Sequence, residues 1–397
     1  MNWTTENHTI IFYPNFNNDL DIKLLANYKI IIFSNYKPNE RLFESYANND
    51  FYYLTYKKNR FNRDISKLPS TLTQLILGDS FNCDVSKLPL NLTHLTFGDD
   101  FNYDVSSLPL FLTHLTFGIC FNQDVSKLPY SLTYLTFGHK FNQDVSILLL
   151  NLIHLTFGNM FNKDVSSLPH NITHLTFGQR FSNDVSSLPH NLTHLTFSLW
   201  FNRNVSSLPH SLTHLTFGQE FNKDVSTLPH SLTHLTFGWS FNQDISTLPH
   251  SLTHLTFGWI FNQDISKLPH TLTNLTLGRG FTQHCDIPSN IKYLKLDCDN
   301  QYIINSLPDS IVELKLGDCF DLEILNLPTS LKKLVILNDN YKHNLNCLPN
   351  FIEELHLNRK YKKRILNIPP NLKKLICDKN YPHINDFTNC KVEFINH

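Results

Sequence analysis

The sequence predicts a repeat solenoid whose parallel β-sheet is built from one short strand per 20-residue unit. Three observations predict this fold. From Phe61 to Gly280 the chain repeats every 20 residues, eleven times, without an insertion. Each unit contains an L-x-x-L-x-F segment or a close variant of it. The apolar residues of one unit are too irregularly spaced to cover a core of their own, so neighbouring units must stack.

The L-x-x-L-x-F segment is the predicted strand, and it is similar to the strand of a leucine-rich repeat. In an extended strand, successive side chains point to opposite faces. Leu255 and Phe257 are therefore expected in the core, while His254 and Thr256 are expected to face outward. Gly258 is expected to end the strand.

The return segment must reach the next strand within about a dozen residues, which leaves little room for a helix. Pro249, Asp244 and Ser246 favour turns and extended structure instead. Leu149 replaces the repeat proline in one unit and Ser198 replaces the glycine in another, but the register continues through both. We therefore expect the fold to tolerate single departures from the pattern.

The chain is expected to form one elongated domain with three regions. Residues 1–60 are predicted to be degenerate N-terminal repeats and a cap, residues 61–280 the regular repeats, and residues 281–397 divergent repeats and a C-terminal cap. Terminal repeats must cover the exposed ends of the core. The weak N-terminal signatures are Phe16-Asn17-Asn18-Asp19-Leu20 and the strand-like spacing of Phe51, Leu54 and Tyr56.

Composition restricts the classes of partner. The 33 Lys and Arg residues nearly balance the 34 Asp and Glu residues, and a net charge of -1 argues against general affinity for nucleic acid or anionic membrane. No stretch approaches the roughly 20 apolar residues of a membrane-spanning helix. The eight cysteines form no C-x-x-C pair, which favours free thiols in a reducing, cytoplasmic compartment.

The repeat closely resembles the FNIP repeat family, a leucine-rich-like group of social amoebae and of large DNA viruses that infect amoebae. The resemblance rests on L-P-H-S-L-T-H-L-T-F-G at Leu248 to Gly258, followed by Phe261-Asn262. It implies repeat-mediated interaction in the cytoplasm, which is the host cytoplasm if the protein is viral. Some members carry an F-box, but residues 1–60 contain no convincing F-box pattern. Asp also stands where a proline commonly follows F-N-x in the family.

Two histidine columns follow from the repeat and hold 14 of the 21 histidines. Neighbours in a column are expected about 4.8 Å apart, close enough for two imidazoles to share a divalent ion. The alternative is a ladder of solvated or hydrogen-bonded neutral rings, since no carboxylate or cysteine completes a site. The outward strand column is His94, His114, His154, His174, His194, His214, His234 and His254, and the column after the proline is His170, His190, His210, His230, His250 and His270.

The strand column also predicts a response to pH. An unperturbed histidine titrates near pH 6.5, so a stacked column would accumulate like charge on acidification. We expect this repulsion to lower the pKa of the histidines in the folded state. Stability would then fall as the pH drops below about 6.5.

The two positions between the strand-ending glycine and the next Phe vary most while the scaffold stays constant, and we call them the rim. Three of the four tryptophans lie there. Trp239 and Trp259 occupy equivalent places in consecutive units and are expected to be neighbours, and Leu199, Trp200 and Ile260 add apolar surface. Exposed Trp with Ile and Leu is typical of an interface hot spot. The alternative is that these rings fold back over the edge of the core.

Two patterns of charged residues have structural interpretations that are simpler than ligand binding. The Asp residue of nearly every unit, as in Asp244, suits a turn in which the carboxylate accepts a backbone amide, whereas calcium sites of β-helices need glycine-rich turns. The basic run from Arg359 to Arg364 is either solvated or a second contact region.

The sequence contains no nucleophile elbow, phosphate-binding glycine loop or H-E-x-x-H motif. We therefore predict a non-enzymatic protein-interaction scaffold without a cofactor or metal, with a protein partner and no nucleic-acid or membrane partner. A metal- or pH-responsive histidine solenoid and an F-box-like ubiquitin-ligase adaptor are the alternatives, and the oligomeric state stays open. The predicted binding residues are Leu199, Trp200, Trp239, Trp259, Ile260, His194, His214, His234 and His254.

Overall fold

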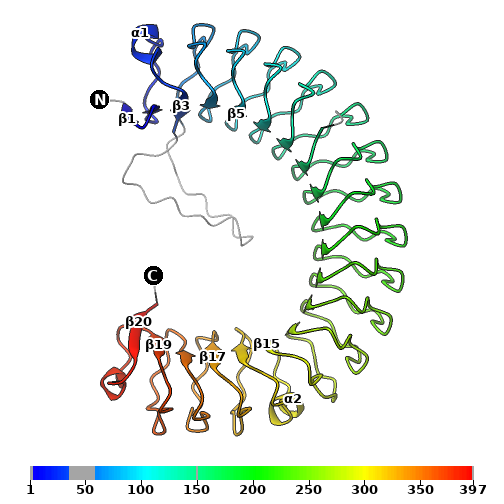
Figure 1. Cartoon of the computed structure of the whole chain (residues 1–397), viewed down its shortest axis with the longest axis vertical. Coiled ribbons are helices and arrows are strands. Elements are labelled where there is room, and N and C mark those ends of the chain that lie inside the picture. The colour runs from blue at the N-terminus through cyan, green and yellow to red at the C-terminus, as the bar shows by residue number, and fades with distance from the viewer. Residues whose placement is uncertain (1–2, 35–58, 149–150, 396–397) are drawn as a thin grey trace. The chain divides into compact units, whose positions relative to one another are not determined.

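A computed structural model describes residues 3–34, 59–148 and 151–395. The chain forms two compact units, Met1–Ser198 and Leu199–His397. In each unit the short strands lie along one face and the return segments along the opposite face (Figure 1). The predicted strand signature of Phe51, Leu54 and Tyr56, and the departure at Leu149, lie outside the described residues.

The first unit begins with an antiparallel pair, β1 and β2, and continues with parallel strands. From β4 onward the register advances by one complete repeat, so that His94 pairs with His114. Its elements are β1 (Trp3–Glu6), β2 (Thr9–Phe12), α1 (Ile22–Leu25), β3 (Ile30–Phe33), β4 (Gln74–Ile76), β5 (His94–Thr96), β6 (His114–Thr116), β7 (Tyr134–Thr136), β8 (His154–Thr156), β9 (His174–Thr176) and β10 (His194–Thr196).

The second unit continues the same pattern with parallel strands, including a final pair of β19 and β20. Its elements are β11 (His214–Thr216), β12 (His234–Thr236), β13 (His254–Thr256), β14 (Asn274–Leu277), β15 (Tyr293–Leu296), α2 (Gln301–Asn305), β16 (Glu313–Leu316), β17 (Lys333–Ile336), β18 (Glu354–His356), β19 (Lys374–Cys377), the 3₁₀ turn η1 (Ile384–Asp386) and β20 (Lys391–Phe394). The predicted parallel β-solenoid with a period of about 20 residues and almost no helix is confirmed.

The core is a ladder of leucine and phenylalanine side chains. Leu255 and Phe257 are buried, as predicted, while His254 and Thr256 are half-buried on the outward face. Phe257 stacks on Phe261 with ring centroids 3.6 Å apart, and Phe261 stacks on Phe241 of the preceding turn at 6.2 Å. Each turn thus buries its rings against its neighbours, because one turn has too few apolar residues to do so alone.

The aspartate column has the predicted turn role. The Asp244 carboxylate accepts the Ser246 amide at 3.0 Å and the Ser246 hydroxyl at 2.8 Å. These bonds lower the pKa of Asp244, since both favour the charged carboxylate. Asn242 is also structural, because its amide donates to the Asn222 side-chain oxygen at 3.0 Å.

The glycine after each strand is needed because consecutive turns approach closely there. A Cβ built on Gly238 would overlap the carbonyl of Gly218 in the preceding turn. Ser198 occupies the equivalent position, is buried, and donates its hydroxyl to the Phe181 carbonyl at 2.7 Å. The predicted tolerance of this departure therefore has a physical basis, since the serine adds a hydrogen bond that alanine would lack.

We expect Gly238→Ala to lower the free energy of unfolding by about 1–3 kcal/mol, because the new methyl group overpacks the turn. Gly238→Ser should cost less, since its hydroxyl can donate to the carbonyl one turn away, as at Ser198. Urea unfolding followed by circular dichroism measures both. Equal stability of the wild type and Gly238→Ala would show that the close approach is not restrictive.

Candidate interaction surfaces

The rim is held by backbone hydrogen bonds between consecutive turns. The Ser240 amide donates to the Gln219 carbonyl at 2.8 Å, and the Ile260 amide donates to the Trp239 carbonyl at 3.1 Å. Because the backbone is occupied in this way, the rim side chains are free to vary without loss of the turn. The fold therefore positions a variable row of side chains on a constant backbone.

Trp239 and Trp259 form a stacked pair on this rim, with ring centroids 4.0 Å apart and an interplanar angle of 22°. The Arg279 guanidinium lies 5.1 Å from the Trp259 ring centroid, so that the stack spans three turns. Trp239 is 45% exposed, and Ile260 is 42% exposed. The rings do not fold back into the core, and stacking on each other and on Arg279 holds their orientation in place.

Trp200 and Leu199 belong to the first turn of the second unit. Trp200 is 50% exposed, and Leu199 is half-buried. The structure brings Trp239 and Trp259 into contact as the repeat predicts. All five rim residues of the predicted binding set are solvent-accessible.

The outward histidines of β5 to β10 and of β11 to β13 form stacks of nearly parallel rings. His234 and His254 have centroids 4.1 Å apart, and Tyr134 replaces a histidine at the same position, 4.3 Å from His114 and from His154. His194 stacks in the same way on its neighbour His174, at 4.1 Å, and His214 stacks on His234 at 4.2 Å. Neighbouring rings are adjacent, as the repeat predicts, and their centroids are closer than the strand spacing of about 4.8 Å.

A threonine hydroxyl defines the ring orientation. The Thr253 hydroxyl lies 3.1 Å from the Thr233 carbonyl and 2.9 Å from Nδ1 of His254. The carbonyl is only an acceptor, so the single hydroxyl proton goes to it and Nδ1 must donate. The neutral ring therefore carries its proton on Nδ1 and leaves Nε2 as an acceptor.

Partial burial lowers the pKa of His114, His154 and His254, and the charge of other histidines in the column lowers it further. The direction agrees with the sequence-based expectation. The cause differs from it, because desolvation of the ring contributes more than repulsion. Repulsion is the smaller effect, since each ring remains half-exposed and water screens its neighbours.

The second histidine column is more loosely arranged. His170 and His190 are tilted with centroids 5.1 Å apart, and His250 and His270 are 6.3 Å apart. Within residues 3–34, 59–148 and 151–395, no three or more His, Cys, Asp or Glu side chains gather closely enough to hold a metal ion.

An apolar row in the first unit was missed from the sequence. Leu90, Leu110 and Tyr130 follow the repeat proline in consecutive turns, and Leu90 is 71% exposed. Phe111 extends the same exposed surface. The available signal was that this column is apolar from Leu90 to Tyr130 and becomes histidine only from His170 onward.

Side chains of alternating charge form a ladder along β16 to β20. Lys333 lies 4.0 Å from Glu313 and 3.4 Å from Glu354, and Lys374 lies 3.6 Å from Glu354 and 2.8 Å from Glu393. Hydrogen bonds from two lysines, one of them Lys374, lower the pKa of Glu393 to about 2. These side chains neutralise one another, so this face is occupied by ion pairs within the chain and presents little uncompensated charge to a partner.

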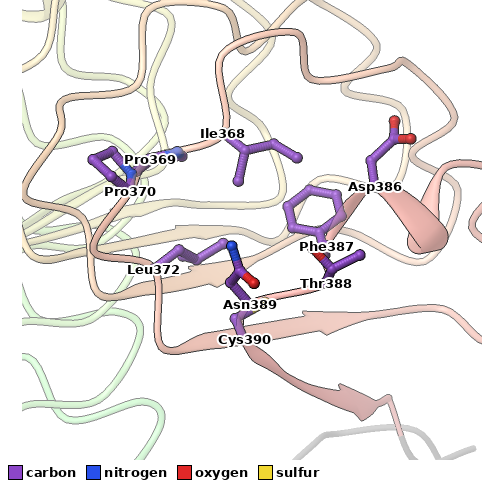
Figure 2. A pocket seen from close by; sticks show the side chains of 9 residues that line it. All are labelled: Ile368, Pro369, Pro370, Leu372, Asp386, Phe387, Thr388, Asn389 and Cys390. Carbon is purple, nitrogen blue, oxygen red and sulfur yellow. The ribbon is translucent and has the colours of Figure 1, made fainter.

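A cavity of about 170 Å³ lies near the C-terminal end of the second unit, where Ile368 and Phe387 approach each other (Figure 2). Its acid, Asp386, is held by the Arg364 guanidinium through contacts of 2.8 Å and 3.2 Å. Burial raises the pKa of the Cys390 thiol, which keeps it protonated and unreactive. The cavity therefore offers no activated nucleophile.

Comparison with known proteins identifies relatives of this architecture. The family model described as FNIP Repeat matches residues 84–120, 150–180, 161–200, 201–240, 224–258, 241–280 and 281–319. The chain is similar to the giant-virus protein CroV588, whose crystal structure is described as a novel circular leucine-rich repeat protein. The two are 32% identical with a TM-score of 0.70, and the match covers 100% of this chain and 71% of that one.

Two bacterial structures are more distant. YopM from Yersinia enterocolitica is 19% identical with a TM-score of 0.45, over 78% of this chain and 79% of that one. InlJ from Listeria monocytogenes is 18% identical with a TM-score of 0.41, over 84% of this chain and 67% of that one. No curated protein matches the chain. None of the helices in the described residues is sufficiently long and apolar to cross a membrane.

The lowered histidine pKa values predict that acid destabilises the fold. A group with a folded pKa below its unfolded value of 6.5 contributes its full stability above about pH 6.5, and that contribution is lost as the pH falls below it. The melting temperature should therefore be higher at about pH 7.5 than at about pH 5.

The matched control replaces His114, His154 and His254 with tyrosine, which the chain itself uses at Tyr134 in the same stack. This variant should retain the ring ladder and lose part of the pH dependence between the two values. If the melting temperature of the wild type does not change over this range, the lowered pKa values do not affect stability.

Proposed function

The chain belongs to the FNIP repeat family, and from this premise we propose that it is a non-enzymatic scaffold that binds a protein partner through its rim and its strand face. The observation that carries the proposal is the stack of Trp239, Trp259 and Arg279, with Ile260 beside it on the rim. Tryptophan and arginine are the residues most enriched at binding hot spots. A stack that is already ordered loses little conformational entropy when a partner covers it.

The histidine face supplies the polar part of the proposed surface. His234 and His254 present Nε2 acceptors beside the threonines of the same strands, because their Nδ1 atoms donate to threonine hydroxyls that themselves donate to backbone carbonyls. His194 is bonded in the same way in the first unit. Such a face suits hydrogen-bond donors on a partner.

The proposed role does not involve catalysis by the repeat. A solenoid places equivalent side chains in rows, whereas catalysis needs a unique arrangement of groups in a pocket. The cavity at Ile368 and Phe387 has an acid paired with arginine and a protonated thiol, which supports a non-enzymatic function. Leucine-rich-repeat-like scaffolds are typically used for binding, because their extended surface is large.

The alternatives have less support. An F-box-like adaptor would need helices near the N-terminus, but the described residues 3–34 form three strands and the one-turn helix α1. A metal-responsive column would need a third ligand beside stacked imidazoles. The likeness to a giant-virus protein supports a viral origin, for which we propose a setting in the host cytoplasm.

The test is capture of partners from amoebal lysate by the purified chain, followed by binding of the purified partner. Replacing Trp200, Trp239 and Trp259 with alanine should weaken that binding by about tenfold or more, since hot-spot tryptophans dominate interface energy. Circular dichroism must show that the variant is folded.

The matched control replaces Leu90, Leu110 and Tyr130 with alanine, which removes a comparable exposed apolar surface from the first unit. This control should bind as the wild type does. If the tryptophan variant bound the partner as tightly as the wild type, the rim would be excluded as the interface. If only the control variant lost binding, the interface would lie on the first unit.

A further inference from the structure

A basic surface covers the turns near β18 and β19, where the rim positions hold Arg359, Lys360 and Lys379. Two contacts place these turns side by side, because the Tyr361 hydroxyl donates to the His343 carbonyl at 3.1 Å and the Tyr381 hydroxyl donates to the Lys363 carbonyl at 2.9 Å. We call this the basic turn surface, and it consists of the exposed residues Lys342, Arg359, Lys360, Lys362, Lys363 and Lys379.

None of these six side chains forms an ion pair with another part of the chain that the structure describes. Arg364, by contrast, is bound to Asp386. The two acids that stand among them have backbone partners: Asp339 accepts the Arg359 amide at 3.2 Å, and Asp378 accepts the Asn380 amide at 2.8 Å. Within residues 339–342, 358–363 and 378–381 six cations stand against two carboxylates, which gives these segments an excess of positive charge in a chain whose net charge is -1.

The positive charge arises where the sequence differs from the regular repeat. In nearly all regular repeats the third residue after the opening phenylalanine is an aspartate whose carboxylate closes its own turn, as Asp244 does. In the unit that begins at Tyr361 the same position is Arg364, and two lysines precede it. The ion pair of Arg364 and the hydroxyls of Tyr361 and Tyr381 hold this turn instead. The side chains of Lys362 and Lys363 form none of these contacts.

We propose that the basic turn surface binds an acidic segment of a polypeptide. Lysine ammonium groups on flexible stems can each meet a separate carboxylate, and four of the five lysine and arginine residues from Arg359 to Arg364 are unpaired within the described structure. This contact is electrostatic and is independent of the tryptophan stack. It supplies a second site, with a defined chemistry, on the same scaffold.

Two observations favour a polypeptide over a nucleic acid. The tyrosine rings of these turns, Tyr341, Tyr361 and Tyr381, are buried, so none is available to stack on a base. Asp339 and Asp378 lie among the cations and would repel a continuous phosphate backbone, whereas a peptide can place its separate carboxylates between them.

The experiment measures fluorescence anisotropy of a fluorescein-labelled oligoglutamate peptide with the full chain at low ionic strength. The test variant carries Lys342→Glu, Lys362→Glu and Lys363→Glu. The control variant carries Lys67→Glu, Lys87→Glu and Lys127→Glu, which are also exposed and change the net charge equally. Circular dichroism verifies folding of both. A labelled oligouridine of equal length is titrated in parallel.

The proposal predicts that the peptide binds the wild type and the control variant equally well and that added salt weakens this binding. The test variant should bind the peptide at least about tenfold more weakly than the wild type. Equal loss in both variants would overturn it, since only net charge would then matter. Absence of binding to the wild type would also overturn it, and tighter binding of oligouridine would assign the surface to nucleic acid instead.

Discussion

Each turn of the two units depends on the carbonyl groups of the turn before it. In β13, the Thr253 and His254 amides donate to the Thr233 carbonyl at 2.9 Å and 3.0 Å, and the Thr253 hydroxyl lies 3.1 Å from the same oxygen. The close approach at Gly238 belongs to the same contact between turns. This constraint sets the register of the strand segment in every turn, because a slip within that segment would separate its donors from their acceptors. The return segment, by contrast, can differ in length by one residue, since Asn274 pairs with Tyr293 and Lys333 with Glu354.

The constraint also determines where function can develop. Positions that face the core or the preceding turn are occupied by the same residue types in nearly every unit. The rim, the outward strand positions and the exposed turn positions are released from this requirement, and the tryptophan stack and the basic turn surface lie there. A scaffold of this kind changes its binding surfaces without changing its core, which is why variation within the repeat is more informative about function than its constant part.

The period made much of the fold predictable. The buried ladder of Leu255 and Phe257 and the turn of Asp244 recur in nearly every regular 20-residue repeat, so the sequence of one repeat predicts them for the others. The divergent turns were less predictable, because the pairing shifts there: Asn274 pairs with Tyr293 and Lys333 with Glu354, 19 and 21 residues apart. The tautomer of His254 depends on a threonine bonded across turns, and the ion pair of Arg364 depends on where Asp386 lies, which sequence spacing does not reveal.

The central claim is that stacking in register on the preceding turn maintains the fold. The most direct measurement is urea unfolding, followed by circular dichroism, of a chain lacking residues 241–260 and of one lacking residues 241–250. Removing a complete repeat should leave a cooperative transition with a slightly lower midpoint, since Ser240 then precedes Phe261 in correct register. Removing half a repeat should abolish the transition of the second unit. Equal stability of the two deletions would contradict the account.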